Sequence, residues 1–342
     1  MLFRSFHRVV YKDAAGDVIV LDTVKQAERW LVETQASKGY ISSAGNPVYN
    51  DAIRALIFRE GSDAHGRART VQTPGGTGAL RVAGDFIHRL RPGGRIFLPD
   101  PTWANHPALF AAAGIEIVTY PYYDVATGQL RFDAMMAALE ALTADDTLLV
   151  HGCCHNPSGT DPDAAQWAAI GDLLAAKGAT PLVDLAYLGF GQGLEEDRAG
   201  IAILAGKVRE MIVASSCSKN FALYRERTGA LTLVAGTPTQ ADAAKGHLLP
   251  VIRANYSMPP DHGAAVVAHI LGDAGLRARW ESELTGMRTR IQDVRRRLVA
   301  QLDGRGGPDF SYLAEQNGMF PLLRPSRDQV PKLRNDSPIY AT

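Results

Sequence analysis

The sequence predicts an α/β fold, with a mostly parallel sheet sandwiched by helices and a second, smaller α+β domain. From about residue 75 onward, short apolar runs alternate with stretches of helical periodicity, which is typical of parallel strands covered by helices on both faces. Polar side chains gather where three of these runs end. A longer apolar stripe of helical spacing begins at Leu276 and indicates a different kind of packing later in the chain.

The predicted sheet is built from apolar runs taken in chain order. These runs are Arg95–Leu98, Ile115–Tyr120, Thr147–His151, Pro181–Asp184, Met211–Ala214 and Ala230–Val234. Helical patterns separate several of them. A glycine cluster opens one helix, and a second follows the i, i+3, i+4, i+7 rule through Trp167, Ile170, Gly171 and Leu174.

The second domain is predicted from residue 276 onward. Its apolar residues share one stripe over Leu276–Leu302, which predicts a long helix. The arginine run at Arg295–Arg297 cannot share one face and is expected to be solvated. Strands at Phe310–Ala314 and Met319–Leu323, followed by a short helix from Ser326, complete the expected α+β unit.

The composition excludes several classes of function. The 342 residues include 36 basic and 36 acidic side chains, so the net charge gives no basis for binding nucleic acid or an anionic membrane. Cys153, Cys154 and Cys217 show neither paired metal spacing nor a disulfide framework. We therefore expect no metal and a reducing cytoplasm. No apolar run reaches transmembrane length, and the first residues lack the pattern of a signal peptide.

The segment Ser215–Arg227 carries the strongest chemical signal in the chain. It follows a buried apolar run, so Lys219 lies where a strand stops and its amine faces a cleft. Partial burial near a second cation lowers the pKa of a lysine and makes its amine nucleophilic. The hydroxyls of Ser216 and Ser218 and the guanidinium of Arg227 suit a phosphate. A Schiff-base amine beside a phosphate site suggests pyridoxal phosphate; the alternative is a solvated loop lysine.

Two further strand ends carry polar side chains, at the edge of a parallel sheet where ligands bind. Asp184 would keep a pyridine nitrogen protonated, while Asn156 and Tyr187 would hydrogen-bond a phenolic oxygen of the same ring and favour its anionic form. Taken singly, Asn156 could belong to a turn and Asp184 could be a helix N-cap. His106 and His155 are expected either as hydrogen-bond partners of Asp184 or as core histidines.

The glycine cluster within Thr73–Leu80 opens a predicted helix. Free backbone N–H groups and the helix dipole form an anion site there. A dinucleotide fold is the alternative, but the glycine spacing does not fit its fingerprint. Trp103 follows the run Arg95–Leu98, and its flat face would either stack on a cofactor ring or lie in the core.

The chain resembles the fold-type I pyridoxal phosphate enzymes, specifically the class I aminotransferases of the aspartate and aromatic subgroup. The matching stretches run in family order from about residue 9 to residue 340, and the Lys219 and HNPSG segments are together highly specific. The stretches are QTPGGTGALRVA, DPTWANHPALF, HGCCHNPSGTDP, DLAYLGFGQGLEED, ASSCSKNFALYRERTGAL, IRANYSMPPDHGA and QNGMF.

The resemblance implies site residues and shared sites in a homodimer. Lys219, Asp184 and Tyr187 would be catalytic, with Lys219 as the Schiff-base lysine. Tyr40 would reach the phosphate in the partner subunit, and Arg253 the side-chain carboxylate of the partner's substrate. The remaining cofactor-binding residues would be Gly76, Thr77, Trp103, Asn156, Ser216, Ser218 and Arg227, and the remaining substrate-binding residues would be Val9, Trp103 and Asn156.

The activity implied by the resemblance is transfer of an amino group from aspartate to 2-oxoglutarate by a ping-pong mechanism, with aromatic amino acids as further substrates. Residues 23–275 would form the large pyridoxal phosphate domain, with residues 1–22 and 276–342 forming a small domain that is truncated at its C-terminal end. No arginine matches the one that clamps the substrate α-carboxylate in the family, so a truncated, catalytically impaired paralogue is the alternative. A lyase is a third possibility, although Arg253 suits a dicarboxylate.

Overall fold

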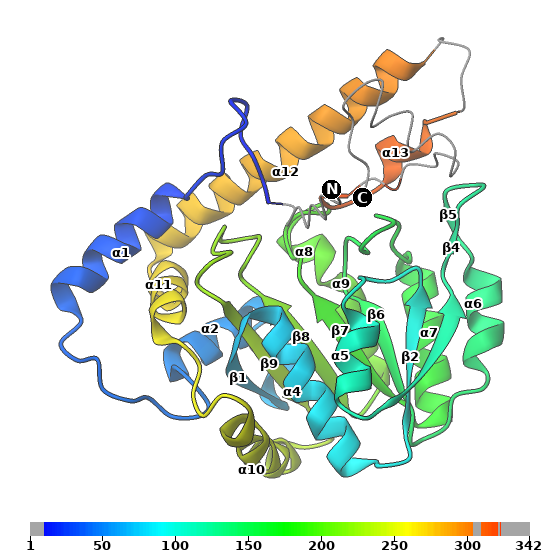
Figure 1. The fold of residues 1–342 in the computed structure, drawn as a ribbon, viewed down its shortest axis with the longest axis horizontal. Coiled ribbons are helices and arrows are strands. Elements are labelled where there is room, and N and C mark those ends of the chain that lie inside the picture. Colours follow the sequence, from blue (N-terminus) through cyan, green and yellow to red (C-terminus); the bar gives the residue numbers. More distant parts are fainter. Residues whose placement is uncertain (1–9, 304–308, 321, 323–342) are drawn as a thin grey trace, which may run out of the picture.

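A central sheet positions every strand end that carries a predicted site residue. In the computed structural model, which describes residues 10–303, 309–320 and 322, its strands lie in the order β1-β9-β8-β7-β6-β2-β3 (Figure 1). They are β1 (Ala68–Pro74), β2 (Arg95–Asp100), β3 (Glu116–Pro121), β6 (Thr147–His151), β7 (Thr180–Leu185), β8 (Met211–Ser216) and β9 (Thr228–Val234). A separate ribbon pairs β4 (Tyr123–Asp124) with β5 (Gln129–Leu130).

The pairing pattern confirms the predicted mostly parallel sheet. Strands β8, β7, β6, β2 and β3 are parallel to one another, whereas β9 runs antiparallel to both β1 and β8. Each predicted apolar run falls on a strand. Strand β1 was not predicted because polar residues interrupt it. Thr70 and Gln72 are nevertheless buried and have distant partners: Gln72 donates to the Pro260 carbonyl at 2.6 Å, and the hydroxyls of Thr70 and Thr232 lie 2.8 Å apart.

Helices cover both faces of the sheet (Figure 1). They are α1 (Asp22–Thr34), α2 (Pro47–Ile57), α3 (Asp63–Gly66), α4 (Gly75–Leu90), α5 (His106–Ala112), α6 (Phe132–Leu139), α7 (Ala164–Lys177), α8 (Leu194–Asp197), α9 (Ala199–Lys207), α10 (Pro238–Asn255), α11 (Asp261–Gly272), α12 (Ala274–Leu302) and α13 (Tyr312–Glu315). Helices α4 and α10 belong to one apolar cluster, and α7 and α9 to the other.

Successive residues of one strand contribute to opposite clusters. Leu149 and Leu182 pack into the cluster that contains α4 and α10, whereas Leu148 and Val183 pack into the cluster that contains α7 and α9. This alternation follows from the two-residue period of a strand. Because both faces are covered, every residue of β6, β7, β8 and β9 is buried, as expected for the interior of a parallel sheet. Polar side chains can therefore meet solvent or a ligand only at the strand ends.

The later part of the chain follows the prediction only in part. The long helix is confirmed as α12, but the strand predicted at Phe310–Ala314 is wrong. Ser311 N–H donates to the Asp309 carboxylate at 2.8 Å, which closes a turn and leads into α13. The described residues of the predicted strand Met319–Leu323 are not in a strand either, and the helix expected from Ser326 lies outside the described residues.

Arg295 also corrects the prediction of a solvated arginine run. Its side chain is buried on α12 and donates to the carbonyl groups of Gln316 and Gly318. Backbone oxygens thus replace the water that a guanidinium normally needs. Periodicity within one helix cannot reveal such a partner, because the accepting segment lies outside that helix.

Within the part of the chain that the structure describes, no helix combines the length and apolar character needed to cross a lipid bilayer.

Candidate active site

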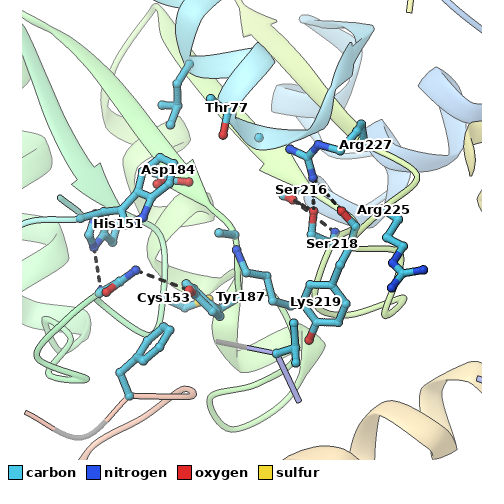
Figure 2. A pocket seen from close by; sticks show the side chains of 18 residues that line it. Thr77, His151, Cys153, Asp184, Tyr187, Ser216, Ser218, Lys219, Arg225 and Arg227 are labelled. Carbon is cyan, nitrogen blue, oxygen red and sulfur yellow. Dashed lines mark hydrogen bonds between the residues drawn. The ribbon is translucent and has the colours of Figure 1, made fainter. Parts of the chain in front are cut away.

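A cavity of about 730 Å³ opens at the carboxyl ends of β6, β7 and β8, beside the first turn of α4 (Figure 2). Ligands of parallel α/β sheets bind at this edge because polar groups from several strands converge there. The structure brings most of the predicted site residues together around this cavity. They are Gly76, Thr77, Trp103, Asn156, Asp184, Tyr187, Ser216, Ser218, Lys219 and Arg227.

Lys219 follows the end of β8 and extends into the cavity (Figure 2). Its Nζ atom lies 4.7 Å from the centre of the Tyr187 ring. Burial lowers the pKa of the Lys219 amine; the negative charge of Asp184 opposes this shift, and the positive charge of Arg227 supports it. A lowered pKa increases the share of neutral amine, which is the form that acts as a nucleophile or a base.

Asp184 lies near the end of β7 and is held by a chain of hydrogen bonds. Its Oδ2 atom is 3.1 Å from Nε2 of His106, whose Nδ1 atom is 2.7 Å from the Thr102 hydroxyl. Burial alone would raise the pKa of Asp184, but the hydrogen bond with His106, together with the electrostatic effect of His106 and Lys219, lowers it below its ordinary value. Asp184 is therefore a carboxylate at neutral pH. The predicted partnership of His106 with Asp184 is confirmed.

His155 takes the other predicted role, that of a core histidine. Its Nδ1 atom lies 2.8 Å from the Ser158 hydroxyl, and its ring stacks on Tyr122 at a centroid distance of 3.9 Å. Burial, with a smaller contribution from the charge of His106, lowers the pKa of His155 to about 3. The ring is therefore neutral and packed, and it does not contact Asp184.

Asn156 and Tyr187 come from neighbouring strand ends and meet in the cavity. The Asn156 side-chain nitrogen lies 3.5 Å from the Tyr187 hydroxyl, at the limit of hydrogen-bond distance. The Asn156 backbone N–H donates to Nδ1 of His151 at 3.0 Å, so the proton of a neutral His151 ring sits on Nε2. Burial lowers the pKa of His151 well below its usual value, and burial raises the pKa of the Tyr187 hydroxyl. The His151 ring and the Tyr187 hydroxyl are thus both neutral and can form hydrogen bonds.

An anion cradle forms where the start of α4 meets the loop after β8. Gly75 has φ = 70°, and a Cβ atom there would lie 2.4 Å from Nη2 of Arg227, so only glycine allows this approach. Nη1 of Arg227 lies 3.4 Å from the Ser218 hydroxyl, which accepts from the Ser216 hydroxyl at 3.0 Å. Figure 2 shows Ser216, Ser218 and Arg227 together, on the other side of the cavity from His151. Helix N–H groups, hydroxyls and a guanidinium are the donors that a phosphate needs.

The remaining predicted residues are placed differently. Trp103 lines the cavity with its ring edge-on to His106, at a centroid distance of 5.3 Å. Tyr40 is 98% exposed, and Arg253 is exposed near the end of α10; neither lines the cavity of its own chain. Val9 lies outside the described residues, although Val10 beside it lines the cavity.

Several cavity residues were not singled out as site residues by sequence reasoning. Tyr224 and Arg225 stand in the same loop as Lys219, so their nearness was a usable signal; the Tyr224 hydroxyl also accepts from the Tyr11 N–H at 2.9 Å and so brings the start of the chain to the site. His151 ends the strand before Asn156. The full set is Val10, Leu80, His151, Cys153, Ala186, Tyr224, Arg225 and Phe320.

The aminotransferase class I and II family profile matches residues 9–342, nearly the whole chain. The chain belongs to this family. This aminotransferase is 48% identical to the aspartate aminotransferase of Salmonella typhi over 335 residues, which cover 97% of this chain and 85% of that protein. It is 43% identical to the aromatic-amino-acid aminotransferase of Pseudomonas aeruginosa, over 97% of this chain and 84% of that protein.

Solved structures agree with the fold. The aromatic-amino-acid aminotransferase of Burkholderia pseudomallei, described as covalently bound to pyridoxal phosphate, superimposes with a TM-score of 0.95 at 40% identity, over 97% of this chain and 84% of that one. The mitochondrial aspartate aminotransferase of Trypanosoma brucei gives 0.92 at 38% identity, over 97% and 87% of the two chains. The predicted fold-type I architecture is thereby confirmed, and the protein is an amino acid aminotransferase.

Pyridoxal phosphate is the cofactor of this family, and the donor set of the cavity fits it. The cradle at Gly75 and Arg227 suits a phosphate, and the buried carboxylate of Asp184 suits a protonated ring nitrogen. The hydroxyl of Tyr187 and the Asn156 amide suit a phenolic oxygen, and Lys219 supplies a partly buried amine for covalent attachment. These groups are the ones that such a cofactor requires.

Proposed function

We propose that this aminotransferase moves the amino group of aspartate, and of aromatic amino acids, to 2-oxoglutarate with pyridoxal phosphate as cofactor. The observation that carries the proposal is the position of the Lys219 amine, partly buried over the Tyr187 ring in a cavity that also holds Asp184 and the anion cradle. The relatives named as aspartate and aromatic aminotransferases support the substrate classes. Their names give no support to the alternatives of an impaired paralogue or a lyase.

When bound, pyridoxal phosphate supplies an electron sink for the bond that breaks at the substrate Cα. Lys219, once displaced by the incoming amino acid, takes the Cα proton, since its lowered pKa leaves more of the amine neutral. Asp184 holds the proton on the ring nitrogen, and the bond from His106 keeps its carboxylate oriented and ionised. Asn156 and Tyr187 would donate to the phenolic oxygen, and Trp103 would contact the ring. An amino donor and a keto-acid acceptor used in turn give ping-pong kinetics.

The cradle residues take the phosphate. Its donors would be the backbone N–H groups of Gly76 and Thr77, the hydroxyls of Ser216 and Ser218, and the guanidinium of Arg227. The bidentate fork of an arginine matches a phosphate better than a lysine does. This anchoring leaves the ring end of the site free to react.

We further propose a homodimer with shared sites, working in the cytoplasm. Tyr40 and Arg253 are exposed on the single chain, which supports the expected roles of Tyr40 at the partner's phosphate and of Arg253 at the partner's dicarboxylate substrate. We also propose Val9 as a substrate-binding residue. The three cysteines are free and buried, in keeping with a reducing compartment. Residues 23–275 would form the large domain, and residues 1–22 with 276–342 the small one.

The test is reduction of the cofactor-loaded enzyme with borohydride, followed by peptide mapping and a transamination assay with aspartate and 2-oxoglutarate. The label should map to Lys219, and Lys219→Ala should abolish both labelling and transamination. Lys177→Ala is the matched control, because this lysine forms a surface ion pair with Glu140 and should leave both unchanged. A label on another lysine, or full activity in Lys219→Ala, would overturn the assignment.

A further inference from the structure

Two adjacent cysteines at the site have no part in the proposed transamination. Cys153 and Cys154 follow β6, and their sulfur atoms lie within 4.8 Å of each other and of the Asp197 carboxylate. Both thiols are buried and free. Cys154 has φ = 52°, in the left-handed region, so the chain turns sharply at this residue and brings the two neighbouring side chains together.

The cofactor cavity gives access to the pair. Cys153 lines that cavity, as Figure 2 shows beside Tyr187. Cys154 lies behind it: its sulfur is 4.0 Å from the Tyr187 carbonyl, and a Cβ atom at Gly318 would approach Cys154 Cβ to 2.6 Å. A small reagent that enters this cavity can therefore meet Cys153 first and then Cys154, and it passes through the space that the cofactor uses.

The surroundings select what two such thiols can hold. Soft centres prefer sulfur ligands, but a divalent cation needs more than two protein ligands. The nearest third candidate is the Asp197 carboxylate, whose oxygens already accept the N–H groups of Gly189, Gly191 and Gln192 at 2.8–2.9 Å. The hydrogen bond with Cys154, and then burial, raise the pKa of the Cys153 thiol, and burial raises the pKa of Cys154 to about 11. A buried site of this kind favours a bound complex that carries no net charge.

We propose that Cys153 and Cys154 form a chelating site for organic compounds of trivalent arsenic, reached through the cofactor cavity. Such a centre carries one organic group and needs only two sulfur ligands. In its hydrated form, with two hydroxyls on arsenic, it forms two As–S bonds and loses two As–O bonds. Each thiol proton leaves with one hydroxyl as water, so two waters are released, arsenic stays trivalent and the adduct is neutral.

The experiment uses phenylarsine oxide on the cofactor-free and the cofactor-saturated enzyme, with intact mass as the readout. One arsenic group should bind per cofactor-free chain, and 2,3-dimercaptopropanol should remove it whereas a monothiol should not. Cys153→Ala and Cys154→Ala should each weaken binding by at least about a hundredfold, because two-point attachment is lost. Cys217→Ala is the matched control: Cys217 is equally buried, lies 3.4 Å from the Tyr49 hydroxyl, and should bind like the native chain.

Saturation with pyridoxal phosphate should slow the reaction at least about tenfold, since the cofactor fills the route to Cys153. The intact-mass measurement does not depend on turnover. A failure of this test can therefore be distinguished from a failure of the proposed function. Absence of a bound group on the native chain, undiminished binding in either alanine variant, or loss of binding in Cys217→Ala would overturn the chelating pair. Equal rates with and without cofactor would overturn the route. Cys153→Ser and Cys154→Ser replace any alanine variant that fails to fold.

Discussion

Arg227 allows the strength of the phosphate anchor to be worked out from its hydrogen bonds. Nη1 donates to the Ser218 hydroxyl at 3.4 Å and to the Tyr224 carbonyl at 3.0 Å, which uses both of its hydrogens. Nη2 lies over Gly75 and keeps two hydrogens for an anion. Charge-assisted hydrogen bonds contribute about 1.5–3 kcal/mol each. Removal of two such bonds by Arg227→Ala should therefore weaken pyridoxal phosphate binding by at least about 3 kcal/mol, or roughly a hundredfold in Kd.

The assay is titration of cofactor-free enzyme with pyridoxal phosphate, followed by visible absorption. Arg227→Lys should fall between the native enzyme and Arg227→Ala, because an ammonium keeps the charge but lacks the planar fork. Arg209→Ala, at an exposed arginine just before β8 and so at the opposite end of that strand from Lys219, is the matched control and should leave Kd unchanged. A Kd for Arg227→Ala within about threefold of the native value would refute the assignment of Nη2 to the phosphate.

Three further predictions concern the ring end, acid stability and assembly. Asp184→Asn should lower kcat/KM at least about tenfold while the Kd of pyridoxal phosphate changes far less, since the cradle is intact. Asp146 is buried, but its hydrogen bonds to Arg95 and Thr143 outweigh burial and lower its pKa from 3.8 to about 2. The ionised carboxylate therefore contributes about 2 kcal/mol to the free energy of unfolding above pH 4, and this contribution is lost as the pH falls towards 2. Acid unfolding curves of Asp146→Asn should lack this pH-dependent loss. Mixed dimers of Lys219→Ala and Arg253→Ala chains should regain part of the dicarboxylate activity.

Each of these outcomes can fail in a distinct way. Normal turnover of Asp184→Asn at saturating cofactor would remove its role at the ring nitrogen. An acid unfolding curve of Asp146→Asn parallel to that of the native enzyme would mean that this carboxylate does not set the acid limb. A fully active monomer by light scattering would exclude sites shared between subunits.

The local pattern of the sequence was sufficient for the parts of the site that follow strand ends. Each apolar run predicted for the central sheet falls on a strand, and Asn156, Asp184 and Lys219 line one cavity at the carboxyl ends of β6, β7 and β8. The reason is that buried parallel strands are continuous apolar runs, so the first polar residues after them must lie at the sheet edge. The same reasoning missed β1, whose buried polar residues pair with distant residues.

The sequence by itself determined the α/β fold, the lysine and the chemistry of the phosphate donors, because these depend on residue type and short-range spacing. The tertiary structure alone decided which histidine serves Asp184. His106 and His155 were equal candidates, yet only the start of α5 places a ring nitrogen 3.1 Å from the carboxylate, while His155 turns to Ser158. It also decided that Arg295 is buried against Gln316 and Gly318. Such partners lie far apart in the chain, and only packing brings them into contact.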